Sequence, residues 1–160
     1  QLKMDKEKLY FFPISTNSST KLKELFFKIS GKRDFKTSHI QTNGRNIKFS
    51  CTSNKVLLTN FNVLCRSYYS AIDYIAIAEK FKWILIDNIP IMTKELRNEI
   101  RRFMILIDIL YEKKIGIAVV AEDAPEKLCN SKEYYKAFKR TSSRLEEMKE
   151  LSWCLENYFN

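Results

Sequence analysis

The stretch WILIDNIPIMTKELRNEIRRFMILIDILYEKKIGIAVVA, residues 83–121, decides the fold of this chain. It contains two short apolar runs, near 83–88 and 115–121, that do not alternate with polar residues, which is typical of strands buried on both faces. The segment between them, near 94–112, has helical periodicity and is long enough to form a crossover helix. We predict a parallel βαβ core with a right-handed crossover.

The residues before this core favour antiparallel pairing. In residues 38–61 apolar and polar side chains alternate, and the Asn43-Gly44 dipeptide is a strong signal for a hairpin turn. This segment therefore predicts an antiparallel hairpin extended into a three-stranded meander. The apolar segment 9–14, which ends beside Pro13, is expected to lie extended against the same sheet.

Apolar residues at helical spacing predict three further helices, and each has polar residues available as caps. They cover residues 18–30, 70–81 and 140–158, and the last is expected to begin at a capping box formed by Ser143 and Glu146. The fold class is thus α/β, with a mixed sheet and a C-terminal helix. At 160 residues, the chain is expected to be a single domain spanning 1–160.

The composition sets limits on the function. No apolar run approaches the length of a membrane span, and no signal-peptide pattern opens the chain, so we expect a soluble, intracellular protein. The four cysteines are scattered and His39 is the single histidine, so no metal site is expected. The net charge of +9 is compatible with nucleic-acid binding, but the lysines form no basic run, which favours a solvated lysine-rich surface.

Asp108 is the first residue that needs a partner. Apolar residues surround it in the helical pattern of residues 103–111, so we expect that half of the helix to be buried nearly all round. An unpaired carboxylate would be costly there. We therefore expect Asp108 to form a structural ion pair with an arginine of another element, or to accept a hydrogen bond from a backbone donor.

Two arginines, Arg140 and Arg144, fall near the expected start of the C-terminal helix, which is the unfavourable end for cations. Two explanations stay open. They reach a phosphate or carboxylate outside the helix with the bidentate guanidinium geometry. Alternatively, they pair with Asp108, Glu147 or another acid in the core.

Other polar residues lie at turns and strand ends. Arg45 follows the turn glycine, so it is either a partner-binding or anion-binding residue at a hairpin tip or a solvated one. Asp87, Glu122 and Asp123 come at the ends of the two core strands, where ligands of open α/β sheets bind. No nucleophile accompanies these carboxylates, so solvated loop residues are the alternative.

Several strings resemble, in order and spacing, the C-terminal half of the ZapE/AFG-like P-loop ATPase family. They are NGRNIKF (43–49), FNVLC (61–65), AIDYIAIAEKF (71–81), ILIDNIP (84–90), RRFMILIDILYEKKIGIAVVAEDAPEKL (101–128) and FKRTSSRLEEM (138–148). The departures are Val120-Ala121 in place of a Ser-Ala pair, Cys129 in place of a tyrosine, and Ser70 in place of a glycine. They lie in strand ends and loops, so they affect activity more than the fold.

The resemblance implies an ATP hydrolase that uses ATP and Mg²⁺ in the full-length protein, with a role in cell division or protein quality control. In this family a glycine-rich phosphate loop, a Walker B acidic pair and a Thr-Ser-Asn sensor precede the region present here, and we expect none of the three motifs in this chain. No glycine of this chain is followed by a Lys-Ser or Lys-Thr pair, so the backbone cradle and lysine of a phosphate-binding loop are missing. We expect no cofactor to bind this chain alone.

The leading hypothesis is therefore the C-terminal portion of such an ATPase, partnered by the N-terminal ATPase half. Arg140 and Arg144, and with less support Arg101 and Arg102, are then candidates to contact the nucleotide phosphates. One alternative is a non-catalytic protein-interaction module that uses the hairpin around Gly44 and Arg45. A second is a basic nucleic-acid-binding domain. The expected location is the cytoplasm, or else the mitochondrial matrix.

Overall fold

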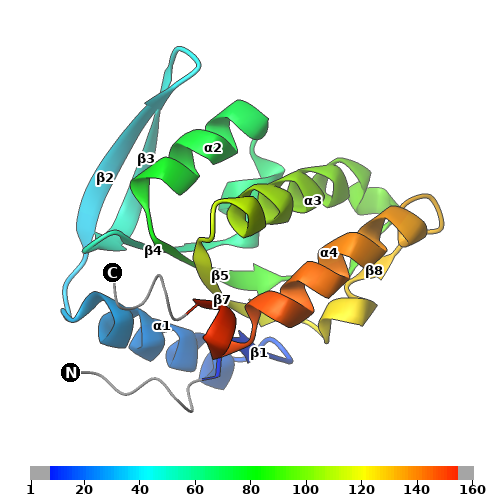
Figure 1. Cartoon of the computed structure of the whole chain (residues 1–160), viewed down its shortest axis with the longest axis horizontal. Helices are drawn as coiled ribbons and strands as arrows, with labels where there is room; N and C mark the ends of the chain where they lie inside the picture. Colours follow the sequence, from blue (N-terminus) through cyan, green and yellow to red (C-terminus); the bar gives the residue numbers. More distant parts are fainter. Residues whose placement is uncertain (1–7, 155–160) are drawn as a thin grey trace.

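The computed structural model describes residues 8–154, and these form a layered α/β body (Figure 1). Within that range a six-stranded sheet has the order β1-β7-β5-β4-β3-β2, and a small second sheet pairs β6 with β8. In chain order the elements are β1 (Tyr10–Phe11), α1 (Thr16–Ser30), β2 (Lys36–Thr42), β3 (Arg45–Ser53), β4 (Val56–Asn60), the π-helical turn η1 (Asn62–Arg66), α2 (Ala71–Lys80), β5 (Trp83–Ile89), β6 (Met92–Thr93), the 3-10 turn η2 (Lys94–Leu96), α3 (Arg97–Glu112), β7 (Gly116–Ala121), the 3-10 turn η3 (Pro125–Lys127), β8 (Cys129–Asn130) and α4 (Tyr135–Met148).

The predicted βαβ core is confirmed. Strands β5 and β7 pair in parallel, with Ile84 opposite Ile117, and α3 connects them. Strand β1 adds in parallel on the far side of β7, and β4 adds in parallel on the far side of β5. The predicted meander is also confirmed, because β2, β3 and β4 pair antiparallel in sequence order. The sheet is mixed, as expected.

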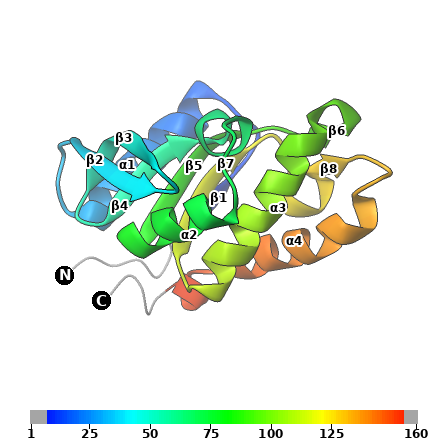
Figure 2. The same ribbon diagram turned by 90° about the horizontal axis from the view of Figure 1, so that it is seen from above.

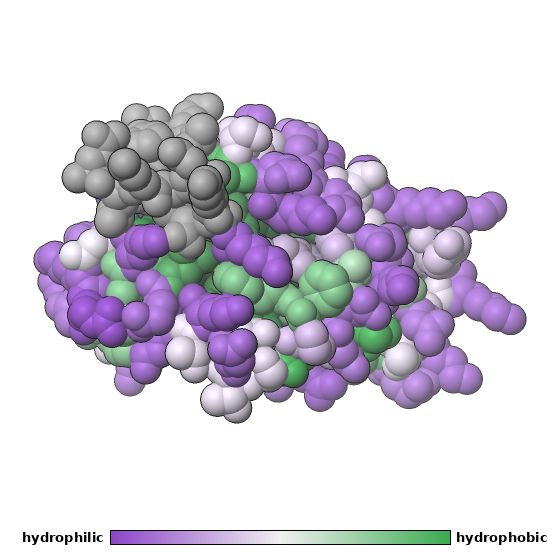
Figure 3. All heavy atoms as spheres, turned by 90° about the horizontal axis from the view of Figure 1, so that it is seen from below, coloured by the Kyte–Doolittle hydropathy of each residue, from purple (hydrophilic) through white to green (hydrophobic). Residues whose placement is uncertain are grey.

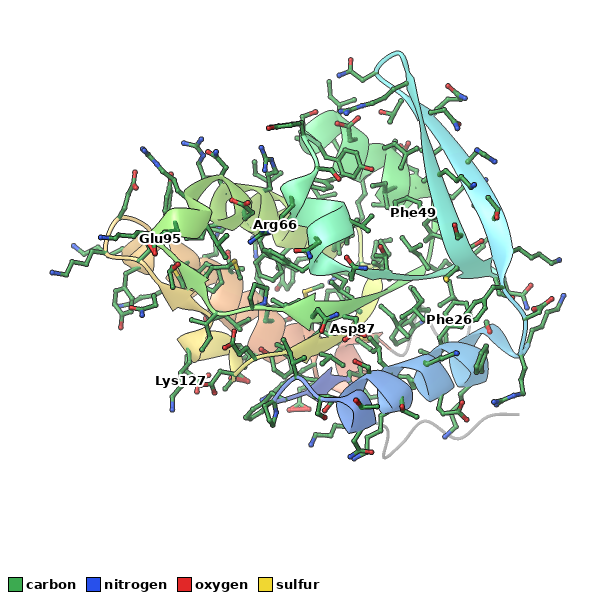
Figure 4. The ribbon with its side chains drawn as sticks, turned by 180° about the vertical axis from the view of Figure 1, so that it is seen from behind. Phe26, Phe49, Arg66, Asp87, Glu95 and Lys127 are labelled. Atoms are coloured by element: carbon green, nitrogen blue, oxygen red, sulfur yellow. The ribbon has the colours of Figure 1, made fainter. Side chains whose placement is uncertain are left out.

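The central strands are buried on both faces, so the sheet needs a layer of helices on each side. Helix α1 covers one face, and α2, α3 and α4 lie on the other (Figures 1 and 2). The side chains that face α1 are Trp83, Leu85, Ala118 and Val120. Those that face the other three helices are Ile84, Ile86, Ile117 and Val119. Figure 4 shows Phe26 and Phe49 on these two opposite sides.

Helix α1 lies on the underside of the molecule, and apolar surface is visible there among hydrophilic side chains (Figure 3). It begins at Thr16, two residues before the predicted start, because Ser15 is its N-cap and accepts a hydrogen bond from the Ser18 amide. It ends at Gly31, whose φ of 75° is the left-handed conformation typical of a C-terminal cap. Its apolar face packs against the sheet residues Trp83, Leu85, Ala118 and Val120 and completes the core on that side.

The predicted bounds of the C-terminal helix, 140–158, are wrong at the start and in their continuity, since α4 ends at Met148 and is interrupted at Lys149 and Glu150. Helix α4 begins at Tyr135, because Phe138 and Thr141 extend the buried stripe toward the N-terminus. No capping box forms at Ser143, which lies in the helix interior. Arg140 and Arg144 are therefore mid-helix residues, so the electrostatic reason for singling them out does not hold. Tyr158, the predicted end, lies outside the described residues.

The expectation that the second half of α3 is buried nearly all round is also wrong. Only one flank of that half packs against the core, through Leu106, Ile107 and Leu110. Ile105 is 39% exposed, and Asp108 is partly exposed beside it. The other flank faces α4 across a surface cavity, so Asp108 sits at an interface between helices rather than in an apolar sleeve.

Gly116 at the start of β7 provides a test of the core packing. A Cβ at this position would lie 2.6 to 2.8 Å from three atoms of the Trp83 indole. We expect Gly116→Ala to lower the free energy of unfolding by about 1–3 kcal/mol through overpacking, as measured by urea denaturation. In a Trp83→Leu background the same substitution should cost much less, since the indole is gone. Equal costs in both backgrounds would contradict the proposed contact.

Candidate functional site

The most concentrated group of charged side chains lies where α3 and α4 face each other. Asp108 on α3 receives both arginines of α4: Arg140 Nη2 donates to Asp108 Oδ2 over 2.7 Å, and Arg144 Nη1 donates to Asp108 Oδ1. Arg144 also lies 3.4 Å from a carboxylate oxygen of Glu112. The two arginines are four residues apart on one face of α4, which lets them share one carboxylate. We call this group the arginine cluster.

The two arginines differ in how firmly they are held. Arg144 is 19% exposed, and its guanidinium lies 4.6 Å from the centroid of the Tyr111 ring. Arg140 is 68% exposed, and Asp108 is its acidic partner. Arg144 is therefore a fixed part of the helix interface, whereas Arg140 can turn toward an anion at the surface with little loss of packing.

A surface cavity of about 520 Å³ adjoins the arginine cluster. Its lining includes Arg101, Ile105, Asp108, Tyr134, Lys136 and Arg140. Arg101 is oriented by two contacts, donating to the Tyr134 hydroxyl over 3.4 Å and to Asn98 Oδ1 over 3.0 Å. Three cations thus face the cavity with a single carboxylate among them.

Lys136 belongs to this site although the sequence reasoning did not select it. A signal was present, because Lys136, Arg140 and Arg144 follow one another at four-residue spacing and so lie along one ridge of a helix. The signal was missed because the helix was expected to begin after Lys136. Guanidinium and ammonium groups arranged in this way can bind a phosphate or carboxylate.

Arg102 does not join the arginine cluster, although it neighbours Arg101 in the sequence. It points to the opposite flank of α3, where its Nη1 donates to the Cys65 carbonyl over 3.0 Å. Its guanidinium also lies 5.2 Å from the centroid of the Tyr68 ring. Arg102 therefore ties α3 to η1.

Arg45 pairs with Asp73, an acid in the first turn of α2. Its Nη2 donates to Asp73 Oδ2 over 2.5 Å and to the Tyr68 carbonyl over 3.1 Å. Asp73 is fully buried and also accepts from the Ser70 amide, as part of a capping box at the start of α2. The pair fastens the hairpin tip to the start of α2, and a partner-binding role for Arg45 stays a prediction.

The carboxylates at the strand ends act locally. Asp87 Oδ1 accepts from the Ser19 hydroxyl of α1 over 3.1 Å, and Figure 4 labels this residue on β5. Glu122 accepts from the Ile91 amide, and Asp123 accepts from the amide of the residue that follows it. Tyr10 donates to the Asp123 carbonyl over 2.7 Å. Burial raises the pKa of the Tyr10 hydroxyl, so it remains a donor and holds this loop.

The cysteines behave as small apolar residues. Cys65, Cys129 and Cys154 are buried, and the described cysteines are free thiols. Burial raises the pKa of the Cys65 thiol, and it raises that of Cys154 to about 12. A thiol with a raised pKa stays protonated near neutral pH, so neither residue has the thiolate character of a reactive cysteine.

The described residues do not fit a nucleotide with its Mg²⁺ ion. The connection from β5 to α3 contains Pro90 and strand β6 and has no glycine, so it cannot form a phosphate cradle. The expectation that no Thr-Ser-Asn triplet occurs is wrong, because one stands at residues 52–54. It lies at the turn between antiparallel β3 and β4, where Asn54 Nδ2 donates to the Ser30 carbonyl. Within residues 8–154 no group of three or more acidic, histidine or cysteine side chains is placed to hold a metal ion.

The fold is thus an α/β domain in which two arginines of α4 pair with Asp108 of α3 beside a surface cavity. The AFG1-like ATPase profile matches residues 1–155, and the chain therefore belongs to the AFG1-like ATPase family. The recognition made from the sequence is confirmed. Among residues 8–154 no helix has the length and apolar character needed to cross a membrane.

Curated relatives cover bacteria and eukaryotes. The chain is 27% identical over 140 residues to the cell division protein ZapE of Escherichia coli K12, a match that covers 88% of this chain and 37% of ZapE. It is 28% identical over 120 residues to lactation elevated protein 1 homolog B of Danio rerio, which covers 74% of this chain and 24% of the relative. An uncharacterized protein of Schizosaccharomyces pombe is 26% identical over 183 residues, covering 96% of this chain and 40% of that protein. The chain thus spans less than half the length of these relatives. No solved structure matches it significantly.

The pair formed by Arg45 and Asp73 generates a prediction about stability. Arg45→Ala leaves a buried carboxylate without its counter-charge, so we expect it to lower the free energy of unfolding by about 2–4 kcal/mol. Asp73→Asn should cost less, about 1–2 kcal/mol, since the partly exposed arginine can turn toward water and the amide oxygen can still cap α2. Urea denaturation of both variants measures the two costs. If Asp73→Asn costs more than Arg45→Ala, the Asp73 carboxylate does not depend on Arg45 for its counter-charge.

Proposed function

We propose that this chain is the C-terminal portion of an AFG1-like ATPase and that it acts together with a separate nucleotide-binding half. One observation carries the proposal. The family profile matches nearly the whole chain, yet the match to ZapE covers 37% of that relative, and no glycine here opens a phosphate-binding loop. ATP and Mg²⁺ bind the other half, and this chain has no ATP turnover alone.

The arginine cluster supplies the phosphate-facing groups in this proposal. Arg140 makes the contact, because it is the more exposed of the two arginines of the cluster and carries the bidentate guanidinium. Arg144 keeps Asp108 in place, and Arg101 adds a second cation at the rim of the cavity. Asp108 holds Arg140 in a defined orientation until a phosphate oxygen replaces the carboxylate. Arg102 has the least support as a phosphate ligand, since its guanidinium donates to the Cys65 carbonyl of η1.

The cellular role is proposed by likeness to the relatives. The Escherichia coli relative is a cell division protein, and we infer a cell division role in the cytoplasm for this chain. Protein quality control in the mitochondrial matrix is the alternative, since relatives also occur in Danio rerio and Schizosaccharomyces pombe. Depletion of the chain followed by microscopy of dividing cells separates the two.

The proposed function is tested by reconstitution. The chain is produced with the polypeptide encoded upstream of it, and phosphate release from ATP is measured with and without the chain. We expect turnover only when both parts are present. Arg140→Ala should lower kcat by about 10³-fold or more, since it removes positive charge from the phosphoryl transition state.

Arg97→Ala provides the matched control for that experiment. Arg97 is also an exposed arginine of α3, where it pairs with Glu133 of the turn before α4, but it does not line the cavity. Its removal should leave turnover unchanged. ATP hydrolysis by the isolated chain would refute the proposal that it is the C-terminal portion. If the Arg140→Ala variant keeps full turnover, Arg140 does not contact the phosphates, but the proposal of a two-part enzyme still stands.

A further inference from the structure

An apolar surface lies on the flank of α3 opposite the arginine cluster. Four of the nine large apolar side chains exposed in residues 8–154 fall between Val63 and Ile75. They are Val63, Tyr68, Ile72 and Ile75, and we call them the α2 patch. Tyr68 is 83% exposed and Ile72 is 60% exposed. Helix α2 faces the viewer in Figure 2, and no other described helix or strand crosses over it.

The backbone beneath the α2 patch is held in place. The Tyr74 hydroxyl donates to the Leu64 carbonyl over 2.6 Å, which joins η1 to α2. Burial raises the pKa of Tyr74, so this donor persists. Arg45 donates to the Tyr68 carbonyl, and the capping box fixes the start of α2. The exposed side chains therefore stand on a preformed surface, which lowers the entropic cost of binding a partner.

The surroundings of the α2 patch are positively charged. Arg45, Arg66 and Arg102 border it, and the Arg102 guanidinium lies 5.2 Å from the centroid of the Tyr68 ring. The two acids that pair with these arginines are withdrawn from the surface, because Asp73 is fully buried and Glu99 is largely buried against Arg66. Glu79, four residues after Ile75 on α2, is an exposed acid at the far end of the patch. Tyrosine and arginine around an apolar centre are characteristic of protein interfaces. A matching partner surface is apolar with an acidic border.

We propose that the α2 patch is the surface on which the nucleotide-binding half of the ATPase docks. This inference rests on the proposed function, and it names the contact surface for that partner. The unmatched length of the relatives supplies a partner of sufficient size. The consecutive residues Arg101 and Arg102 point to opposite flanks of α3, one into the cavity and one onto the patch. A body lying across α3 would therefore contact both the patch and the arginine cluster.

Two charge-introducing variants, Tyr68→Glu and Ile72→Glu, test the docking surface. Each places a carboxylate in the apolar centre of the patch, and we expect the dissociation constant for the upstream polypeptide to rise about tenfold or more. Both should fold normally. The two side chains are largely exposed, and Ile72 lies in the first turn of α2, where a carboxylate suits the helix dipole. Thermal unfolding checks this, and calorimetric titration measures binding.

Tyr135→Glu is the matched control. Tyr135 is likewise an exposed tyrosine with a cation near its ring, Lys139, but it lies at the start of α4 away from the patch. We expect the dissociation constant of the Tyr135→Glu variant for the upstream polypeptide to stay within about twofold of that of the original chain. Binding should also weaken as salt is raised, because the arginine border contributes to the attraction.

The outcomes separate this inference from the proposed function. If both patch variants bind the upstream polypeptide as the original chain does, the docking surface is wrong, while reconstituted ATP turnover still supports the two-part enzyme. If the variants lose binding but the original complex has no turnover, the surface stands and the ATPase assignment fails. If the upstream polypeptide does not bind the original chain at all, the inference is overturned. A dimer of the isolated chain that Tyr68→Glu dissociates would assign the patch to self-association and also overturn it.

Discussion

The burial of β5 and β7 on both faces is the constraint on which the rest of the structure depends. Their side chains alternate between two apolar clusters, so helices must cover the sheet from both sides. Helix α1 closes one side and the three later helices close the other. Trp83 of β5 pairs with Gly116 of β7 where both strands begin, and the indole fits there because glycine has no side chain. The arginine cluster exists because α4 then packs beside α3.

The parts of the fold that the sequence predicts correctly have local signals. The two apolar runs, the helix between them and the Asn43-Gly44 turn each follow from neighbouring residues, and pairing of β5 with β7 follows from chain connectivity. The start of α4 was missed because Phe138 shows its role only by stacking on Phe103 of another helix. Propensity and caps favoured a later start, and tertiary packing determined the actual one.

The candidate site was likewise predictable only where its signal lies in neighbouring residues. Asp108 stands out in an apolar run, so the need for a partner is visible locally, and the residues that meet it lie on α4. The approach of Arg45 to Asp73 depends on how the hairpin folds back over α2, which no spacing rule reveals. The divergence of Arg101 from Arg102 likewise appears only once the neighbours of α3 are known.

Strand β2 forms one of the two edges of the large sheet, and its composition limits how the molecule can assemble there. It presents exposed Lys36, His39 and Gln41, and its register with β3 shifts near its start. Such edges discourage a further strand from adding by main-chain hydrogen bonding. Association of this molecule is thereby directed to side-chain surfaces of the helical layers, where contacts can form and dissolve without extending a sheet. The same edge protects the chain from aggregation during synthesis, while the rest of the sheet is still forming.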